Sequence, residues 1–493
     1  MRRLLLYPVL GLLALAPFSL ATAQPDPSPA FEPDECPMYL PGYVDEGTEI
    51  RCGYVTVPEY HAAPEGDTLR LAVAILPATG DDPAPDPLVY AAGGPGSSAL
   101  NEATFPFFSS SVAGDLRVTR DIVLIEQRGT RYSEPHLSCL PEMRDAEDDT
   151  LDAGFTLNRF TQNAVAASIA CHDRLTADGI DLSAYNSLEN AADFPFVMSA
   201  LGYDKYNLLG VSYGSVLTQH ILRDHSENVR SVIMDSVVPL DSSFITRIPA
   251  NADRAMQYLF DACAVDPDCA AEYPNLEATF FDIIARMNSK PLDITLGAGF
   301  IGPEYEVQIT GDMVVRLLFL SLYLPDALDV LPDYIDGLAR GDSEWVEFYP
   351  VGFTNPNISD GMNFSIVCAE DGVFELDEVQ TADIAPEIAE VMVNASPKLY
   401  YSLCPYWDVA PLPDHTRQLV QSEVPVLMLS GAYDPITPEI FAQEVSQGLA
   451  THYAYTFADH GHSVFFGNRC AREIATDFLA APDVEPDAAC LAD

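Results

Sequence analysis

One serine of this sequence stands between two glycines in a pattern typical of a covalent nucleophile. Gly210-Val211-Ser212-Tyr213-Gly214 follows an apolar run, residues 206–209, and precedes a helix-like segment, residues 216–224. A hydroxyl on a sharp turn between a strand and a helix needs neighbours without a Cβ, because backbone and helix approach closely there. The start of a helix also favours a developing oxyanion through its free N–H groups and its dipole. The pattern predicts that Ser212 attacks a carbonyl group, and a plain glycine-rich turn is the alternative.

A carboxylate and a histidine that could serve this serine follow later in the chain. Asp434 comes just after an apolar run, residues 424–430, and His462 comes just after another, residues 452–458. In a serine, histidine and acid triad the neutral histidine takes the serine proton, and the acid fixes its tautomer and stabilises the imidazolium. The carboxyl ends of strands in open α/β sheets are where such groups collect. The spacing therefore predicts a triad of Ser212, Asp434 and His462.

A second glycine-rich loop could stabilise the negative charge that such an attack creates. Gly93-Gly94-Pro95-Gly96-Ser97-Ser98 follows the apolar run 87–92. A tight loop after a strand can point backbone N–H groups at one spot, as an oxyanion hole requires. A phosphate-binding loop is the alternative, but the Lys-Ser/Thr ending of that motif is missing. We interpret the loop as an oxyanion hole.

The elements around these motifs predict a mostly parallel sheet. Apolar runs alternate with helical periodicity, and such alternation is typical of parallel strands with helical crossovers. The further runs interpreted as strands are 121–126 and 229–234, and the helical segments are 160–174 and 188–201. Residues 54–57 and 69–76 predict a solvent-facing first hairpin.

A different character begins at residue 238 and lasts to about residue 423. Helical periodicity dominates there, so we predict an inserted, mostly helical lid between two parts of the sheet domain, 24–237 and 424–493. The fold class is therefore α/β, with a sheet flanked by helices. The helices expected in the lid are 253–264, 276–287, 313–322, 327–338 and 384–393.

The charge of the chain excludes one class of partner. The formal net charge of the 493 residues is −50, and no block of Lys or Arg interrupts it. Nucleic acids and anionic membranes bind clustered cations, so neither is an expected partner.

The first 23 residues have the pattern of a secretory signal. Arg2 and Arg3 precede the apolar run 4–20, and Ala21-Thr22-Ala23 supplies small residues for cleavage. An uncleaved membrane anchor is the alternative, and no later stretch reaches the length of a membrane span. We expect a secreted or periplasmic protein.

Ten cysteines in an exported chain indicate oxidised pairs rather than a metal site, because no CxxC spacing occurs. We predict that sequence neighbours pair, although other connectivities stay open. The predicted pairs are Cys36 with Cys52, Cys139 with Cys171, Cys263 with Cys269, Cys368 with Cys404, and Cys470 with Cys490.

Together the motifs resemble one family. They are similar to those of the proline iminopeptidase and tripeptidyl aminopeptidase group of α/β-hydrolase serine peptidases, and the lid motifs look more like the secreted tripeptidyl aminopeptidase branch. The resemblance covers roughly residues 52–490. It is carried by Gly93-Gly94-Pro95-Gly96, Glu126-Gln127-Arg128-Gly129, Leu201-Gly202-Tyr203, Gly210-Val211-Ser212-Tyr213-Gly214, Cys368, Cys404-Pro405-Tyr406-Trp407, Gly431-Ala432-Tyr433-Asp434-Pro435-Ile436-Thr437-Pro438 and Gly461-His462-Ser463.

The resemblance implies roles for single residues. It makes Ser212 the nucleophile, Asp434 the acid and His462 the base, with the oxyanion hole at the backbone N–H groups of Tyr213 and Gly94. It favours His462 over His460 because the family places a glycine directly before this histidine. Asp235, after the strand next to the serine strand, is the alternative acid.

One motif departs from the family pattern. Glu126 stands where the family usually has Asp, and Arg131 where it often has Gly. For Arg128, a structural salt bridge is at least as well supported as a contact with substrate.

These observations predict a serine exopeptidase that hydrolyses peptides from a free N-terminus, without metal or cofactor. Such an enzyme must hold an ammonium group with carboxylates. We expect Glu370 and Asp371 to do so, with Tyr406 and Trp407 beside the cation. A carboxylesterase or amidase with the same triad and a small ester or amide substrate is the first alternative. An inactive hydrolase fold that only binds is the second.

Overall fold

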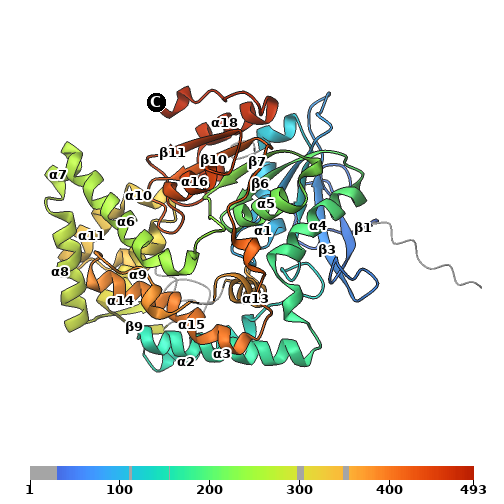
Figure 1. Ribbon diagram of the computed structural model, residues 1–493. Helices are drawn as coiled ribbons and strands as arrows, with labels where there is room; N and C mark the ends of the chain where they lie inside the picture. Colours follow the sequence, from blue (N-terminus) through green and yellow to red (C-terminus); the bar gives the residue numbers. More distant parts are fainter. Residues whose placement is uncertain are drawn as a thin grey trace, which may run out of the picture.

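The computed structural model describes residues 30–109, 114–154, 156–296, 305–347, 355–372 and 374–492. The predicted signal, residues 1–23, lies outside the described residues. A large sheet with helices on both faces forms one lobe, and a group of helices forms the other (Figure 1).

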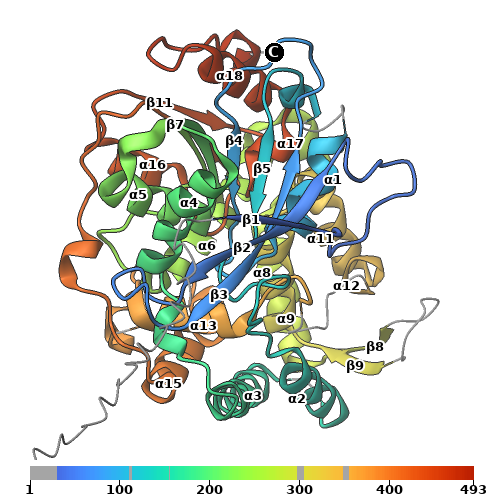
Figure 2. The same cartoon turned by 90° about the vertical axis from the view of Figure 1, so that its right-hand side faces the viewer.

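The sheet has nine strands in the order β1-β2-β3-β5-β4-β6-β7-β10-β11. Pairing is antiparallel from β1 to β5 and parallel from β5 to β11, so the six strands nearest the site run in one direction. Figure 2 shows the antiparallel end of the sheet. The strands are β1 Phe31–Asp34, β2 Arg51–Pro58, β3 Thr68–Leu76, β4 Leu88–Ala91, β5 Ile122–Ile125, β6 Tyr206–Val211, β7 Val229–Asp235, β10 Val426–Gly431 and β11 His452–Phe457.

Both faces of the sheet are covered, and for this reason its central strands are continuous apolar runs. Successive residues of a strand point to opposite faces. Leu208 packs in the cluster with α4 and α5, and its neighbour Leu209 packs in the cluster with α1 and α18. The helices that flank the sheet are α1 Ala99–Phe108, α4 Ser187–Leu201, α5 Tyr213–Asp224, α16 Glu439–Ser446, α17 Val464–Gly467 and α18 Arg469–Ala480.

The first hairpin, β2 and β3, is not solvent-facing as predicted. Val55 and Leu71 lie in the cluster on one face of the sheet, and Ala72 and Ala74 lie in the cluster on the other. The alternation that suggested one exposed face instead distributes small and large apolar residues between two covered faces.

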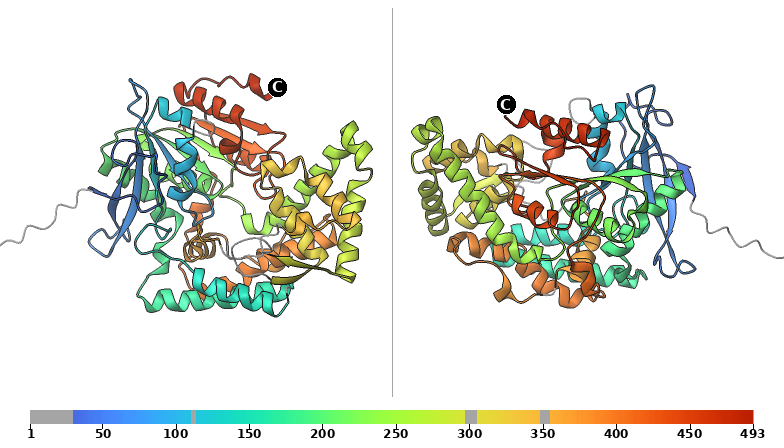
Figure 3. Two further views of the ribbon diagram at one scale, coloured as in Figure 1. Left: turned by 180° about the vertical axis from the view of Figure 1, so that it is seen from behind. Right: turned by 45° about the horizontal axis from the view of Figure 1, so that its top comes forward.

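A lid follows β7 and ends before β10, as the sequence indicates. It is mostly helical and contains one hairpin, β8 Leu292–Leu296 with β9 Tyr305–Ile309. Figure 3 shows it from behind beside the sheet. Its helices are α6 Phe244–Val265, α7 Pro267–Glu272, α8 Leu276–Ser289, α9 Gly311–Ser321, α10 Pro325–Leu328, α11 Leu331–Arg340, α12 Glu344–Glu347, α13 Asp360–Glu370, α14 Pro386–Ala395 and α15 Pro397–Trp407.

Two details of the lid differ from the sequence prediction. Residues 327–338 form two helices, and Pro332, in the first turn of α11, is the physical reason because proline cannot donate to a preceding turn. Helices α2 Leu140–Asp152 and α3 Leu157–Ala177 extend from the sheet lobe under the lid, where Leu151 and Phe160 join its apolar core (Figure 1).

Ten cysteines form five disulfides, each between successive cysteines of the sequence. The bonds join Cys36 to Cys52, Cys139 to Cys171, Cys263 to Cys269, Cys368 to Cys404, and Cys470 to Cys490. Across the residues that the structure describes, no helix has both the length and the apolar character needed to cross a membrane.

Candidate active site

Ser212 occupies a sharp turn between β6 and α5. Its φ of 57° and ψ of −120° lie outside the common regions, and its N–H donates to the carbonyl of Asp235 at 2.9 Å. A Cβ on Gly210 would lie 2.3 Å from the carbonyl oxygen of Gly214, and a Cβ on Gly214 would lie 2.0 Å from that of Ala91. Both glycines are therefore required by the close approach of strand and helix, as the elbow pattern predicts.

Asp434 and His462 meet at the carboxyl ends of β10 and β11. The Nδ1 of His462 lies 2.8 Å from Oδ2 of Asp434. Asp434 is fully buried, while 14% of the His462 side chain is exposed. This pairing leaves the other imidazole nitrogen, Nε2, free to accept a proton.

The surroundings of this pair favour its charged form. Burial on its own would raise the pKa of Asp434, but the facing His462 and the donors around the carboxylate hold that pKa below its usual value. Burial likewise opposes the imidazolium, yet the charge and hydrogen bond of Asp434 raise the pKa of His462 above 6.5. The acid thus stays ionised inside the protein, and it strengthens the base.

Thr437 completes the acid's set of hydrogen bonds. Its hydroxyl donates to Oδ2 of Asp434 at 2.5 Å and lies 3.1 Å from Nδ1 of His462. The N–H groups of Ile436 and Thr437 donate to Oδ1 of Asp434 at 3.0 and 2.8 Å. A carboxylate that accepts several such bonds tolerates burial without a proton.

Asp235 and His460, the alternatives to Asp434 and His462, contact other groups. Asp235 accepts from the N–H groups of Val464 and Phe465 at 3.1 and 2.8 Å, so it holds the loop that follows His462. Burial raises the pKa of Asp235 to about 6. His460 contacts Asp459 at 2.9 Å, so its ring is directed to a different carboxylate from that of His462.

The glycine loop after β4 lies against the elbow. A Cβ on Gly93 would be 3.0 Å from the carbonyl oxygen of Val211 and 3.1 Å from Cβ of Ser212, so a larger residue would be tightly packed there. Gly94 has a φ of +106°. Residues near α13 hold the loop in place: Asn363 donates to the carbonyl of Pro95 at 3.0 Å, and the N–H of Ser359 donates to that of Gly96 at 2.8 Å. Gly94 of this loop and Tyr213, the first residue of α5, line one cavity together with Ser212.

The neighbouring Glu126-Gln127-Arg128 segment is structural. Arg128 is fully buried and forms a two-pronged ion pair with Asp193, with both N···O distances 2.8 Å. Its remaining N–H groups donate to backbone carbonyls. Glu126 is also buried, with a pKa raised by burial to about 7, and it accepts from Ser98 at the end of the glycine loop. These residues support the loop from behind.

A cavity of about 110 Å³ lies between the elbow and the lid, and Glu370 and Asp371 at the end of α13 share it with Ser212. Apolar side chains form much of its wall. The lining residues are Gly94, Pro95, Ser212, Tyr213, Val216, Val238, Phe244, Ile245, Asn363, Ile366, Val367, Glu370, Asp371 and Tyr400. The structure thus brings both predicted lid acids to the cavity of the predicted nucleophile.

The two acids are firmly held. Glu370 accepts from the N–H and the hydroxyl of Ser187 at 2.8 and 2.9 Å, and the same hydroxyl lies 2.8 Å from the phenol of Tyr213. Asp371 accepts from the N–H of Ile245 at 2.7 Å. Burial raises the pKa of Glu370 to about 7 and that of Asp371 to about 6. Both carboxyl groups therefore titrate near neutral pH.

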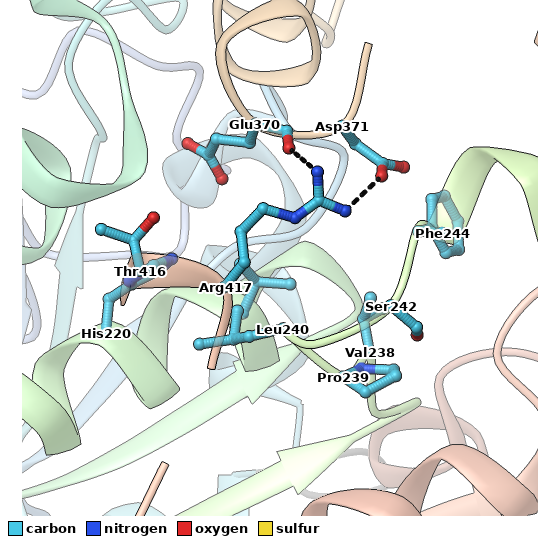
Figure 4. Close-up of a pocket in the computed structure, with 11 residues that line it drawn as sticks. His220, Val238, Pro239, Leu240, Ser242, Phe244, Glu370, Asp371, Thr416 and Arg417 are labelled. Carbon is cyan, nitrogen blue, oxygen red and sulfur yellow. Dashed lines mark hydrogen bonds and ion pairs between the residues drawn. The ribbon is translucent and has the colours of Figure 1, made fainter. Parts of the chain in front are cut away.

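One cation accompanies this acid pair from the other side. Arg417 donates to the backbone carbonyl of Glu370 at 2.8 Å and to the carboxylate of Asp371 at 3.4 Å (Figure 4). About a third of its side chain is exposed, and it borders a second, mostly apolar hollow behind the acids. Two carboxylates and one guanidinium carry a net charge of −1 when all three are ionised.

Comparison with known proteins agrees with this geometry. Residues 86–266 match the family model described as alpha/beta hydrolase fold, and residues 391–490 match the one described as TAP-like protein. The chain is an α/β hydrolase. The fold class and the family that the motifs predict are thereby confirmed.

Three relatives of the chain have different names. Serine protease Hip1 of Mycobacterium tuberculosis is 26% identical over 89% of this chain and 86% of its own. Tripeptidyl aminopeptidase of Streptomyces lividans is 33% identical over 38% of this chain and 35% of its own. Carboxylesterase B of M. tuberculosis is 26% identical over 94% of this chain and 92% of its own. The chain is similar to all three, and the names support a serine hydrolase without choosing its substrate.

Trp407 of this hydrolase does not lie where the sequence predicted. It is fully buried, donates from its indole to Ser365 at 2.9 Å and packs against the rings of Phe364 and His172. Tyr406 is 61% exposed and does not line the cavity. Trp407 stands seven positions after Tyr400 in α15, a spacing of about 10 Å along the helix axis. The predicted placement of Tyr406 and Trp407 is thus wrong, and Tyr400 is the residue of this helix that lines the cavity.

Other residues also lie at this site, and the sequence motifs did not predict them. Tyr400 and Phe244 line the cavity, and Asn363 joins the lid to the oxyanion loop by its bond to Pro95. Asn363 begins an Asn-Phe-Ser triplet that matches the glycosylation pattern, and its side-chain amide is occupied in this contact. Thr437 belongs to the motif that contains Asp434. Its place three residues after the acid was the one available signal.

Proposed function

We propose that this hydrolase is a serine exopeptidase that releases residues from the free N-terminus of peptides through an acyl-enzyme. The observation that carries the proposal is the shared cavity: two carboxyl groups, Glu370 and Asp371, line the cavity that Ser212 enters. The sheet domain, 24–237 with 424–493, would supply the triad, and the lid, 238–423, the acids.

The chemistry follows the positions of the three proposed triad residues. Oγ of Ser212 attacks the scissile carbonyl while Nε2 of His462 takes its proton. The oxyanion forms beside the N–H groups of Tyr213 and Gly94. Collapse breaks the C–N bond, and the imidazolium gives its proton to the departing amine. Water, deprotonated by the same imidazole, then hydrolyses the ester and restores Ser212.

The acid pair explains why a free N-terminus would be selected. An ammonium group that enters a cavity with apolar walls loses hydration, and a carboxylate partner must compensate. Arg417 offsets one of the two negative charges, so the site carries one charge that a single ammonium neutralises. An N-acetylated peptide brings no cation and leaves that charge unpaired. The backbone bonds to Ser187 and Ile245 keep the carboxylates in place before substrate binds.

The five disulfides support a site of action outside the cytoplasm, because such bonds persist in oxidising compartments. A secreted or periplasmic enzyme is therefore part of the proposal.

A carboxylesterase or amidase is the second candidate. It is favoured by the similarity to carboxylesterase B over 94% of the chain and by the apolar residues of the cavity wall, such as Val238, Phe244 and Ile366. An ester substrate would use the same triad and would ignore the acid pair. An inactive binding protein is disfavoured because every triad position is filled.

One peptide tested with a free and with an acetylated N-terminus separates the two candidates. We expect the wild-type enzyme to cleave the free peptide much faster. Glu370→Gln and Asp371→Asn should raise KM for the free peptide about 30-fold or more, since removing one partner of a buried charge pair costs about 2 to 5 kcal/mol. Asp360→Asn is the matched control, because Asp360 is a half-buried carboxyl at the other end of α13 whose pKa is likewise raised by desolvation to about 7.

The outcomes are distinct. Equal cleavage of both peptides by the wild type would contradict the exopeptidase proposal, and ester turnover without peptide turnover would establish the second candidate. Equal loss in Asp360→Asn would show that the acid pair acts only through lid stability.

A further inference from the structure

A lid residue reaches the acid of the proposed triad. Arg254 lies on α6, the first helix of the lid, and extends to the loop between β10 and α16. Its Nη1 donates to the carbonyl of Ala432 at 2.9 Å, and its Nη2 donates to the carbonyl of Asp434 at 2.5 Å. Both carbonyls belong to the turn that carries the acid. The side chain of Arg254 thus connects the lid to the backbone of the Asp434 loop.

A planar guanidinium is suited to holding such a turn. Its N–H groups form a rigid fork, so two bonds fix the two carbonyls relative to each other. The carboxylate of Asp434 extends from the residue so held and contacts His462 at 2.8 Å. A shift of the turn would change this contact, and displacements of about 1 Å at a catalytic group can cost about 100-fold in rate.

The histidine loop is touched by the lid as well. The ring of Tyr323, just after α9, lies edge-on to the imidazole of His462 with 5.1 Å between centroids. A Cβ on Gly461 would lie 2.1 Å from the carbonyl oxygen of Leu322, so the two backbones are in close contact. Acid and base are therefore both held between sheet and lid.

We propose that Arg254 is a positioning residue through which the lid fixes the Asp434 turn and so the contact of Asp434 with His462. The proposal rests on the proposed triad and is independent of whether the substrate is a peptide or an ester. Arg254 acts through Asp434, and it need not touch substrate.

The contact between Asp434 and His462 gives the proposal a signature in the pH profile. The charged groups that face the imidazole are Asp434 on its loop and Asp235 at the end of β7, with Arg254 behind Asp434 and Tyr323 as a neutral neighbour. Glu439, 3.7 Å from Arg254, is the second acid near the guanidinium. The charge and the hydrogen bond of Asp434 raise the pKa of His462, so a weaker contact between the two should lower that pKa. Removal of Arg254 should therefore move the acidic limb of kcat/KM to lower pH.

Arg254→Met in the full-length chain tests this, with p-nitrophenyl acetate as substrate and fluorophosphonate labelling as a second readout. We expect kcat to fall about 10- to 100-fold with KM almost unchanged, and the acidic limb to move to lower pH. Arg286→Met is the matched control, because Arg286 on α8 donates in the same two-carbonyl manner to Leu338 and Ala339 within the lid. The control should leave the rate and the pH profile unchanged.

Arg254→Lys keeps the charge and loses the fork, so it should lower kcat and move the acidic limb in the same direction by a smaller amount. A wild-type rate and profile in Arg254→Met would overturn the proposal, and so would an equal loss in Arg286→Met. If Arg254→Met does not fold, a wild-type kcat in Arg254→Lys overturns it instead. Activity retained by Ser212→Ala would refute the triad itself, which is a separate failure.

Discussion

The sheet and the lid contribute to the site in different ways. The sheet supplies Ser212, Asp434 and His462 from the ends of β6, β10 and β11, where parallel strands place their loops at one edge. The lid supplies Glu370 and Asp371 from the end of α13, and it supplies Arg254 from α6. Chemistry would thus reside on a rigid scaffold, whereas selection of the substrate, and the hold on the acid turn, would reside on the inserted helices.

The difference teaches how each region could vary. Strands β6 and β10 form hydrogen bonds with a strand on each side, and β11 forms them with β10, so the positions of the strand ends depend little on the lid sequence. The cavity wall depends on which face of each lid helix points inward. A change in the lid could alter the substrate and leave the triad intact, with the Asp434 turn and its Arg254 contacts as the exception.

Replacing the nucleophile should have the largest effect. Ser212→Ala removes the covalent route, and kcat should fall on the order of 10⁶-fold, as when the serine of a comparable triad is removed. Labelling by a fluorophosphonate should disappear while the thermal midpoint of unfolding stays near that of the wild type. Near-normal turnover would show that the sheet does not supply the chemistry.

The acid and the base give the next largest effects. Asp434→Asn should lower kcat about 10⁴-fold, because the amide can stabilise the wrong tautomer of His462. Asp235→Asn should cost much less, since Asp235 holds the backbone of residues 464 and 465 rather than the imidazole. His462→Ala should likewise exceed His460→Ala. The reverse order in either pair, measured on one ester substrate, would overturn the assignment.

The pH profile should separate the contributions of sheet and lid. His462 acts as a base only when neutral, and its pKa lies above 6.5, so kcat/KM for any substrate should fall below that pKa. For a free-amine peptide Glu370 also gains a proton near pH 7, so KM should rise in the same range and the limb should be steeper. The substrate amine, with a pKa of about 8, adds an alkaline limb. Identical profiles for peptide and ester would contradict the role of the acid pair.

The sequence predicted the sheet side of the site better than the lid side, for a physical reason. Ser212 is constrained locally: strand, tight turn and helix follow one another, and Gly210 and Gly214 are imposed by contacts within a few residues or with the adjacent strand. The position of Trp407 depends on the helical phase of α15 and on its packing against α3, more than 200 residues earlier. Arg254 gave no signal at all, because its partners are backbone carbonyls, which leave no pattern in the sequence.

The smallest expected effect comes from the disulfide next to the acid pair. Cys368 and Cys404 are 36 residues apart and tie α13 to α15, whereas Cys263 and Cys269 are six residues apart at the far end of α6. Loop-closure entropy predicts stabilisation of about 4 kcal/mol for the first bond and about 2 kcal/mol for the second. Because Glu370 ends α13 two residues after Cys368, and Asp371 comes next, loss of the first bond should also loosen the amine site.

Replacing Cys368 and Cys404 together by serine should therefore lower the thermal midpoint and raise KM for a free-amine peptide several-fold, with kcat for an ester almost unchanged. The matched pair Cys263→Ser and Cys269→Ser should lower the midpoint less and leave both kinetic constants as they are. The measurement is KM for both substrates at a temperature well below either midpoint. A fall in ester kcat in the first variant would mean that this bond also supports the triad. The two lobes would then not contribute separately to catalysis and to substrate selection.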